Sequence, residues 1–160
     1  MVKTIVINPE KCSSCRICEL VCSAKHHYEY NPSRSRIKVD IFADEFVYIP
    51  HTCQQCNEPW CMNICPTGAL ARDEKTDAVK VESEKCVGCK MCILACPFGN
   101  MKYDSENGCA EKCDLCGGKP ECVKHCFFGA LEYQEPELIS DTRHKLFSER
   151  LKASFTKEVE

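Results

Sequence analysis

The chain has 160 residues, which is enough for one domain or two small ones. Its 17 cysteines far exceed ordinary globular usage, and its net charge of −3 includes no basic block that would indicate nucleic acid. No apolar run approaches a membrane span, and the N-terminal stretch MVKTIVINPEKC resembles no secretion signal. We therefore expect a cytoplasmic protein without direct membrane insertion, whose reduced cysteines bind metal.

The first cysteine run, at residues 10–22, reads EKCSSCRICELVC and has the spacing C-x2-C-x2-C-x3-C. This spacing predicts a tight loop that directs three thiolates at one centre, with backbone N–H groups facing the cluster sulfurs. The fourth cysteine, Cys22, is expected at the start of a short helix, where it cannot reach that centre. In two-cluster bacterial ferredoxins, such a fourth cysteine binds the neighbouring [4Fe–4S] cluster instead.

The segment after the first run contains no cysteine and has the alternation of a β-hairpin. Residues 36–42 alternate between apolar and polar side chains, and residues 46–49 continue in β-prone types. We expect residues 31–52 to form a β-hairpin insertion that covers a cluster or forms a partner surface.

The remaining runs repeat a two-motif unit, so the architecture is a duplication. Residues 53–70 read CQQCNEPWCMNICPTGAL, and two short strands around a polar turn near residues 74–77 lead to a third run, EKCVGCKMCILAC, which repeats the first. The fourth run, at residues 113–131, reads CDLCGGKPECVKHCFFGAL and repeats the second. Four motifs supply sixteen thiolates for four [4Fe–4S] clusters. Structural zinc is disfavoured, because it uses paired C-x2-C knuckles and would waste ligands in every run.

Cys109 is the cysteine that the repeats leave over. The triplet E-K-C introduces the first ligand at Cys12 and Cys86, and it recurs at Cys113, whereas counting from Cys109 reproduces no motif. We expect Cys109 to be a small buried thiol. The alternatives are a swapped ligand or a reactive thiol.

The cysteine-free tail could form a helix over residues 141–155, with Phe147, Leu151 and Phe155 on one face. This apolar stripe favours packing against the rest of the chain, and docking to a partner subunit is the alternative.

The connection from CPTGAL through a hairpin to EKC closely resembles the middle of a bacterial two-cluster ferredoxin. This resemblance implies that the second and third motifs form one module, which leaves the first and fourth motifs to pair with each other. The expected reciprocal ligand sets are Cys12, Cys15, Cys18 with Cys126 (set 1); Cys113, Cys116, Cys122 with Cys22 (set 2); Cys53, Cys56, Cys61 with Cys96 (set 3); and Cys86, Cys89, Cys92 with Cys65 (set 4).

The whole span of residues 10–131 resembles the four-cluster subunits that accompany molybdenum or tungsten oxidoreductases, formate dehydrogenases, hydrogenases and carbon monoxide dehydrogenases. The four motifs in this order carry the resemblance, together with TCQQCNEPWCMNICPTGAL and KCDLCGGKPECVKHC. The stretch CSAKHHYEYNPSRSRIKV resembles small subunits found with tungsten aldehyde oxidoreductases and carbon monoxide dehydrogenases. One departure is that Ser23 and Phe127 stand where a proline usually follows the last cysteine of a motif.

The resemblance implies an α+β fold made of a duplicated bacterial-ferredoxin-like unit. The expected parts are an outer two-cluster module at residues 1–30 and 102–135, the hairpin insertion at 31–52, an inner two-cluster module at 53–101 and a tail at 136–160.

Several side chains beside the ligands could tune the clusters. Lys11, Lys85 and Lys112 each precede a first ligand, and they are expected to be solvated surface lysines, with electrostatic tuning as the alternative. With sixteen thiolates available, we expect no ligand role for the five histidines. Trp60 is expected to shield its cluster from water.

No phosphate-binding glycine loop or nucleophile motif is present, so we expect no catalysis by this chain. The expected function is single-electron transfer between a larger catalytic subunit, best identified as a tungsten or molybdenum aldehyde oxidoreductase type, and an external flavin or ferredoxin acceptor. A formate dehydrogenase, hydrogenase or carbon monoxide dehydrogenase partner is about equally favoured. Two further hypotheses are a free polyferredoxin that serves several enzymes and a cluster-bearing regulatory or assembly protein.

Overall fold

The computed structural model describes residues 3–135 together with Ser148 and Lys152. Within this part the chain has an α+β fold in which short helices and two-stranded antiparallel sheets alternate. The predicted helix at residues 141–155, with its apolar stripe, lies outside the described residues. None of the described helices is long and apolar enough to cross a membrane.

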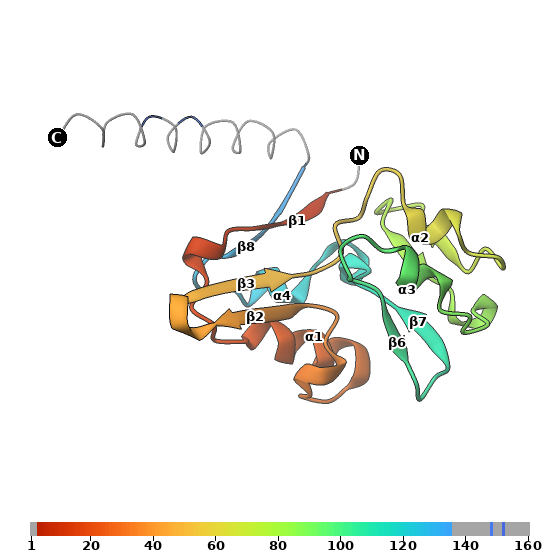
Figure 1. Cartoon of the computed structure of the whole chain (residues 1–160), viewed down its shortest axis with the longest axis horizontal. Helices are drawn as coiled ribbons and strands as arrows, with labels where there is room; N and C mark the ends of the chain where they lie inside the picture. The colour runs from red at the N-terminus through yellow and green to blue at the C-terminus, as the bar shows by residue number, and fades with distance from the viewer. Residues whose placement is uncertain (1–2, 136–147, 149–151, 153–160) are drawn as a thin grey trace.

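The first and last strands meet, although more than a hundred residues of sequence separate them. Strand β1 (Thr4–Ile7) pairs with β8 (Leu131–Gln134) in an antiparallel register that sets Ile5 opposite Tyr133. Helix α1 (Ile17–His27) packs against α4 (Glu121–Lys124) beneath this sheet. The segments that carry the first and fourth motifs therefore form one unit, shown on one side of the molecule in Figure 1.

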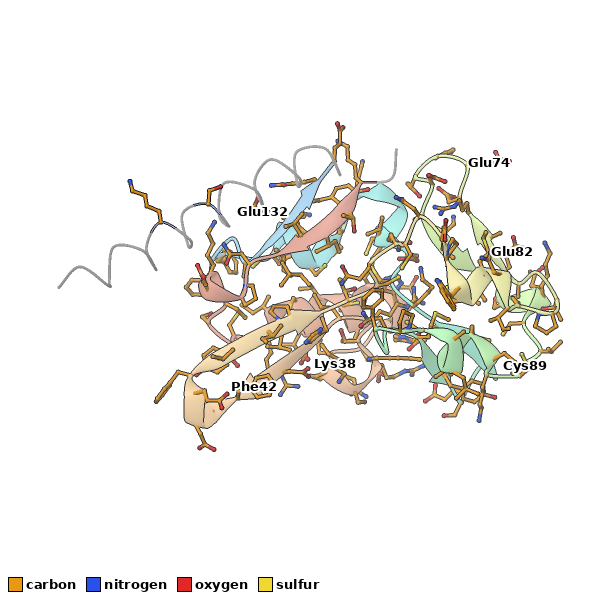
Figure 2. The ribbon with its side chains drawn as sticks, turned by 45° about the horizontal axis from the view of Figure 1, so that its top comes forward. Lys38, Phe42, Glu74, Glu82, Cys89 and Glu132 are labelled. Atoms are coloured by element: carbon orange, nitrogen blue, oxygen red, sulfur yellow. The ribbon has the colours of Figure 1, made fainter. Side chains whose placement is uncertain are left out.

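The predicted hairpin after the first motif is confirmed. Strands β2 (Lys38–Phe42) and β3 (Val47–His51) pair antiparallel, with Val39 opposite Pro50. Val39, the one buried residue of β2, lies in the same core cluster as Ile5 and Leu131, together with Ile37, which is two residues earlier and so on the same face of the extended chain. The hairpin covers α1 and extends to an exposed end at Phe42 (Figures 1 and 2).

The second and third motifs lie in a separate group of elements. Helix α2 (Trp60–Asn63) packs against α3 (Met91–Ala95), and the predicted hairpin between the motifs is confirmed as β4 (Leu70–Arg72) paired with β5 (Val79–Val81). A further hairpin joins β6 (Lys102–Asp104) to β7 (Cys109–Glu111). These elements share a second core cluster formed by Leu70, Val79, Cys92, Met101 and Ala110.

We call residues 4–51 and 113–134 the outer half and residues 53–111 the inner half. The hairpin β6–β7 falls in the inner half, since Ala110 is buried in its core cluster, although the sequence leads us to expect residues 102–135 in the outer module. Of the described 3-10 helices, the first and fourth end directly before a ligand loop, the fifth lies within one, and the second and third flank strand β2. They are η1 (Pro9–Lys11), η2 (Pro32–Arg34), η3 (Ala43–Glu45), η4 (Ser83–Lys85) and η5 (Leu115–Gly118).

Candidate metal centres

The four cysteine loops share one unusual backbone conformation. The residue just before the second cysteine of each motif has a positive φ in all four, at 58°, 49°, 66° and 58°. These residues are Ser14, Gln55, Gly88 and Leu115. A left-handed backbone costs a non-glycine residue about 1–2 kcal/mol, and residues held in it cluster at functional sites. The shared turn supports the interpretation that all four runs are ligand loops of one kind.

Two cavities are each lined by four cysteines from two different motifs. The cavity in the outer half is bounded by Cys12, Cys15, Cys18 and Cys126. The cavity in the inner half is bounded by Cys53, Cys56, Cys61 and Cys96. In each cavity three cysteines come from one motif and the fourth comes from its partner motif. These lining residues coincide with predicted sets 1 and 3.

The cysteines of set 2 also lie close to one another. Cys22, Cys113 and Cys122 are all buried in the outer core cluster. Burial raises the pKa of the Cys122 thiol, and the neighbouring charges of Cys113, Cys22 and Cys116 raise it further. Thiols this near one another cannot ionise together unless a cation is bound between them.

Set 4 is gathered beside the inner core cluster, where Cys92 is buried and Cys65 and Cys86 pack against it. The pKa of the Cys92 thiol is raised to about 11, chiefly by burial. The neighbouring charge of Cys86 raises this pKa further, and that of Cys89 raises it by a smaller amount. Cys89 itself is exposed. The cysteines of set 2 therefore lie close to one another in the outer half, and those of set 4 lie close to one another in the inner half.

The spacing of the sulfurs argues against zinc. Four thiolates bound to one zinc ion at 2.3 Å would lie about 3.8 Å apart. Among the residues that the structure describes, the groups of three or more candidate ligand atoms within 4.8 Å of one another are His26–Asp114–Cys116 and His27–Asp104–Glu111. Neither contains two cysteines, so the cysteine sets are arranged around a larger centre than a single ion.

Backbone N–H groups donate to three predicted ligand sulfurs; the Gln55 donor lies within the second motif, whereas Arg36 and Ala110 lie outside the four motifs. The N–H of Arg36 donates to Cys22 Sγ at 3.3 Å, and that of Ala110 donates to Cys86 Sγ at 3.4 Å. The N–H of Gln55 donates to Cys53 Sγ at 3.4 Å. Such hydrogen bonds to sulfur stabilise the thiolate and influence the reduction potential of an iron–sulfur cluster.

The expected position of the fourth cysteine at the start of a short helix is wrong. Cys22 lies in the middle of α1, and Cys96 caps the C-terminal end of α3. Cys65 and Cys126 follow the ends of α2 and α4. A helix in each motif thus carries the third cysteine, and in the last three motifs the fourth cysteine lies at or just beyond the C-terminal end of that helix. Helix α1 continues past Cys22 because Ser23, unlike a proline, retains its N–H.

A polar cleft lies between the two halves and contains side chains to which the sequence alone assigns no role. Arg36 pairs with Glu111 at 3.4 Å and with Asp114 at 3.2 Å, and His27 lies 3.2 Å from Glu111. His26 Nε2 lies 3.7 Å from Cys116 Sγ, and burial lowers the pKa of this histidine to about 4. A neutral His26 can therefore donate to or accept from the sulfur, while the absence of histidine ligands stays a prediction.

The expectation that Lys112 is a solvated surface lysine is wrong. Its side chain is buried, and Nζ donates to the carbonyl oxygens of Val79 and Cys113 and to Gln55 Oε1. Lys11 and Lys85, by contrast, are about half exposed and form surface ion pairs. The difference follows from local structure: these two lysines end 3-10 helices, whereas Lys112 directly follows the inner strand β7.

Gln55 bridges the two halves, although no motif in the sequence indicates a role for it. It is buried, its Nε2 donates to the Cys113 carbonyl at 2.8 Å, and its Oε1 accepts from the Val79 N–H at 3.0 Å. The alignment of the motifs offers one indication, because Gln55 stands directly before the second cysteine, where the third motif has Gly88. Both residues have a left-handed backbone conformation. Its buried contacts, however, arise from segments distant in the sequence.

Two further expectations are met only in part. Cys109 lies on β7, half-buried rather than fully buried, and burial raises the pKa of its thiol, which disfavours a reactive thiolate. Trp60 lines the cavity of set 3, but 66% of its surface is exposed, so it shields one side of that cavity only.

The geometry fits a sulfur-ligated inorganic cluster. The two four-cysteine cavities have a suitable donor set, and their thiolates would be held in place by folded loops before binding. Burial raises the pKa of Cys61 and of Cys56, with the ammonium of Lys112 opposing the rise at both. Metal binding at these sites would therefore displace protons from thiols that would otherwise be neutral.

Known proteins support this chemistry. Residues 44–136 match the 4Fe-4S dicluster domain, and residues 9–25 match a 4Fe-4S binding domain. The chain is 48% identical over 76% of its length to the aliphatic sulfonate oxidoreductase, polyferredoxin-like subunit, of Pyrococcus furiosus, covering 70% of that protein. It is 32% identical over 81% of its length to the thiosulfate reductase electron transfer subunit PhsB of Salmonella typhi, covering 74% of that protein.

A solved structure extends the similarity to the whole chain. The active site complex BamBC of benzoyl coenzyme A reductase in complex with benzoyl-CoA contains a chain that is 28% identical to this one. The two superimpose with a TM-score of 0.50 over 98% of this chain and 97% of that one.

Proposed function

Because the chain belongs to the 4Fe-4S dicluster domain family and binds [4Fe–4S] clusters, we propose that it is the electron-transfer subunit of an oxidoreductase complex. It carries single electrons through four clusters between a larger catalytic subunit and an external flavin or ferredoxin protein. The bound clusters supply reversible one-electron oxidation and reduction. Each electron accepted from the donor leaves to the acceptor, so the chain undergoes no net change.

The observation that carries the proposal is the pair of cavities lined by four cysteines each. Cys12, Cys15 and Cys18 with Cys126 would hold one cluster, and Cys53, Cys56 and Cys61 with Cys96 would hold another. The proximity of the other eight cysteines supports two further clusters, with Cys22 completing set 2 and Cys65 completing set 4. The pairing of β1 with β8 supports the discontinuous outer module.

The burial of the ligands suggests an order for the four sites. Cys15 of set 1 and Cys89 of set 4 are exposed, whereas three cysteines of set 2 are buried. Cys53 of set 3 packs against the core cluster that contains Cys113 of set 2, so sets 2 and 3 are neighbours at the boundary. We infer the order 1, 2, 3, 4, with the exposed cysteines at the two ends, where partner proteins can approach.

The catalytic partner is proposed to be a tungsten or molybdenum oxidoreductase of the aldehyde oxidoreductase type. A second candidate is an aliphatic sulfonate oxidoreductase, favoured by the 48% identity to the polyferredoxin-like subunit of that name. With either candidate, the partner subunit catalyses the reaction of the substrate and this chain transfers the electrons.

Purification from the native source tests the proposal. The expected result is a stoichiometric larger subunit, with about sixteen irons per copy of this chain and tungsten or molybdenum in the partner. Reduction of the complex by an aldehyde or by an aliphatic sulfonate distinguishes the two candidate partners. A monomer that several enzymes reduce would instead identify a free polyferredoxin, and clusters that no physiological donor reduces would identify a regulatory protein.

A further inference from the structure

Lys112 is a buried cation at the boundary between the two halves. Only 3% of the residue is exposed. Its Nζ donates to the Cys113 carbonyl at 2.9 Å in the outer half, to the Val79 carbonyl in the inner half, and to Gln55 Oε1 at 3.4 Å. Three oxygen acceptors match the three N–H donors of a lysine ammonium group, so each of these donors has a partner.

The charge of Lys112 has no acidic partner among the residues that the structure describes. No carboxylate in the part of the chain that the structure describes forms an ion pair with its Nζ, although sixteen other such pairs are found there. A buried charge without a counter-charge is strongly unfavourable. Lys112 does, however, line the cavity bounded by the four cysteines of set 3. The thiolates of that set are anions, and they are the compensating charge that the site offers.

We propose that Lys112 raises the reduction potential of the cluster held by Cys53, Cys56, Cys61 and Cys96. This inference rests on the proposed function, since it assumes a reducible cluster in that cavity. Reduction adds one negative charge to the cavity, and a fixed cation in a medium of low dielectric constant stabilises the reduced form more than the oxidised form. The electron comes from the donor protein and passes to the acceptor, so Lys112 takes part in no bond change.

The position of Lys112 at the boundary means that the raised potential would also influence electron transfer between the two halves. The cavity of set 3 lies on the inner side of the boundary that an electron must cross to reach set 2. A raised potential at this point favours the arrival of an electron at the boundary, from whichever end it enters. The hydrogen bonds of the same ammonium to Val79 and Cys113 hold the two sides of the boundary together.

The chain offers matched controls for this charge. Lys11 and Lys85 occupy the same place in the E-K-C triplet, directly before Cys12 and Cys86. Their side chains are 51% and 58% exposed, and they pair with Glu132 and Glu82. Water and salt screen an exposed, paired charge, so these lysines should influence their clusters little.

Redox titration of the purified chain, followed by electron paramagnetic resonance, tests the inference. The signal of set 3 is assigned as the one that the variant Cys56→Ser removes or alters. In Lys112→Met, with iron content unchanged, the equilibrium constant for reducing that cluster is expected to fall at least tenfold, which is about 59 mV for a one-electron couple. Lys112→Arg is expected to change this constant less than threefold. Lys11→Met and Lys85→Met are expected to change the corresponding constants of the clusters of sets 1 and 4 less than threefold.

An unchanged potential in fully loaded Lys112→Met would overturn the inference and leave the proposed function intact. If Lys112→Met fails to load its clusters, Lys112→Gln provides the same test, because it removes the charge while its amide N–H groups can still donate to the Val79 and Cys113 carbonyls. A potential that falls in Lys112→Gln supports the inference, and one that does not fall overturns it. A wild-type chain without reducible clusters would overturn the proposed function itself.

Discussion

The outer and inner halves contain the same pair of motifs but bury them to different depths. In the outer half Cys18, Cys22, Cys113 and Cys122 are buried, whereas in the inner half only Cys92 is, among the described residues. Figure 2 shows Cys89 at the surface of the inner half, far from the hairpin end at Phe42 in the outer half. Similar ligand spacing therefore does not give the predicted ligands equal environments.

The segments around the motifs explain the difference. Helix α1 has 11 residues and α3 has five, because Pro97 follows Cys96 and disfavours a helical conformation there, whereas Ser23 follows Cys22. The hairpin β2–β3 exists only in the outer half and packs over α1. Since solvent exposure is one of the factors that set cluster potentials, the two halves should differ in potential and in access.

Iron removal should show this difference most strongly. With an iron chelator under anaerobic conditions, iron is expected to leave in at least two phases, and the slowest should contain about a quarter of the total, from the buried set 2. Complete removal should also abolish most of the circular dichroism of the folded chain, because ligand binding supplies much of its folding free energy. A single phase of iron release would contradict the difference in burial.

The second-largest effect is expected at Gly88, the residue of the third ligand loop that has a left-handed backbone conformation. A Cβ at Gly88 would lie 2.7 Å from the backbone oxygen of Gly108, so Gly88→Ser should prevent normal packing and lose the iron of set 4. Gly68→Ser is the matched control, because its φ is also positive but nothing lies within 4 Å. That control should lose only about 1–2 kcal/mol, the cost of the left-handed backbone. Iron analysis and thermal unfolding measure both effects.

The equivalent outer residue, Ser14, should respond in the opposite direction. Ser14→Gly removes the cost of the left-handed conformation and is expected to keep all iron, with a stability gain of up to about 1 kcal/mol. Loss of iron from Ser14→Gly would show that the two loops are not equivalent.

A smaller effect is expected from the contact that joins α1 to the hairpin. Glu19 is buried, and it accepts from Arg16 Nε at 2.7 Å and from the Val39 N–H at 2.9 Å. Glu19→Gln keeps the shape but removes the charge, and it should lower the free energy of unfolding by about 1–3 kcal/mol. Chemical denaturation measures this change, and iron release from set 2 should become faster while that from set 4 stays the same.

The smallest effect is expected at Cys109. Cys109→Ser should keep the full iron content and change the free energy of unfolding by less than about 0.5 kcal/mol, because the residue is half-buried on a short strand. Loss of about a quarter of the iron would mean that Cys109 is a ligand and would revise the assignment of the fourth motif.

Much of the site followed from local patterns in the sequence. Both predicted hairpins are present, because alternation of apolar and polar residues reports which face of a strand is buried. The left-handed turn of each ligand loop is a local property of C-x2-C, and it recurs in all four motifs. The helix positions were less predictable, since Cys22 lies within α1 rather than at its start.

The sequence by itself determined which ligand residues and which duplication to expect, and the chemistry of the bound group, because these depend on motifs and on spacing over a few residues. Only the tertiary structure decided which lysine is buried. Lys11, Lys85 and Lys112 share the triplet E-K-C, yet only Lys112 lies at the boundary of two halves, where Val79 and Gln55 approach from elsewhere in the chain. Burial and hydrogen bonding between distant segments set the environment of a charge, and no local pattern encodes them.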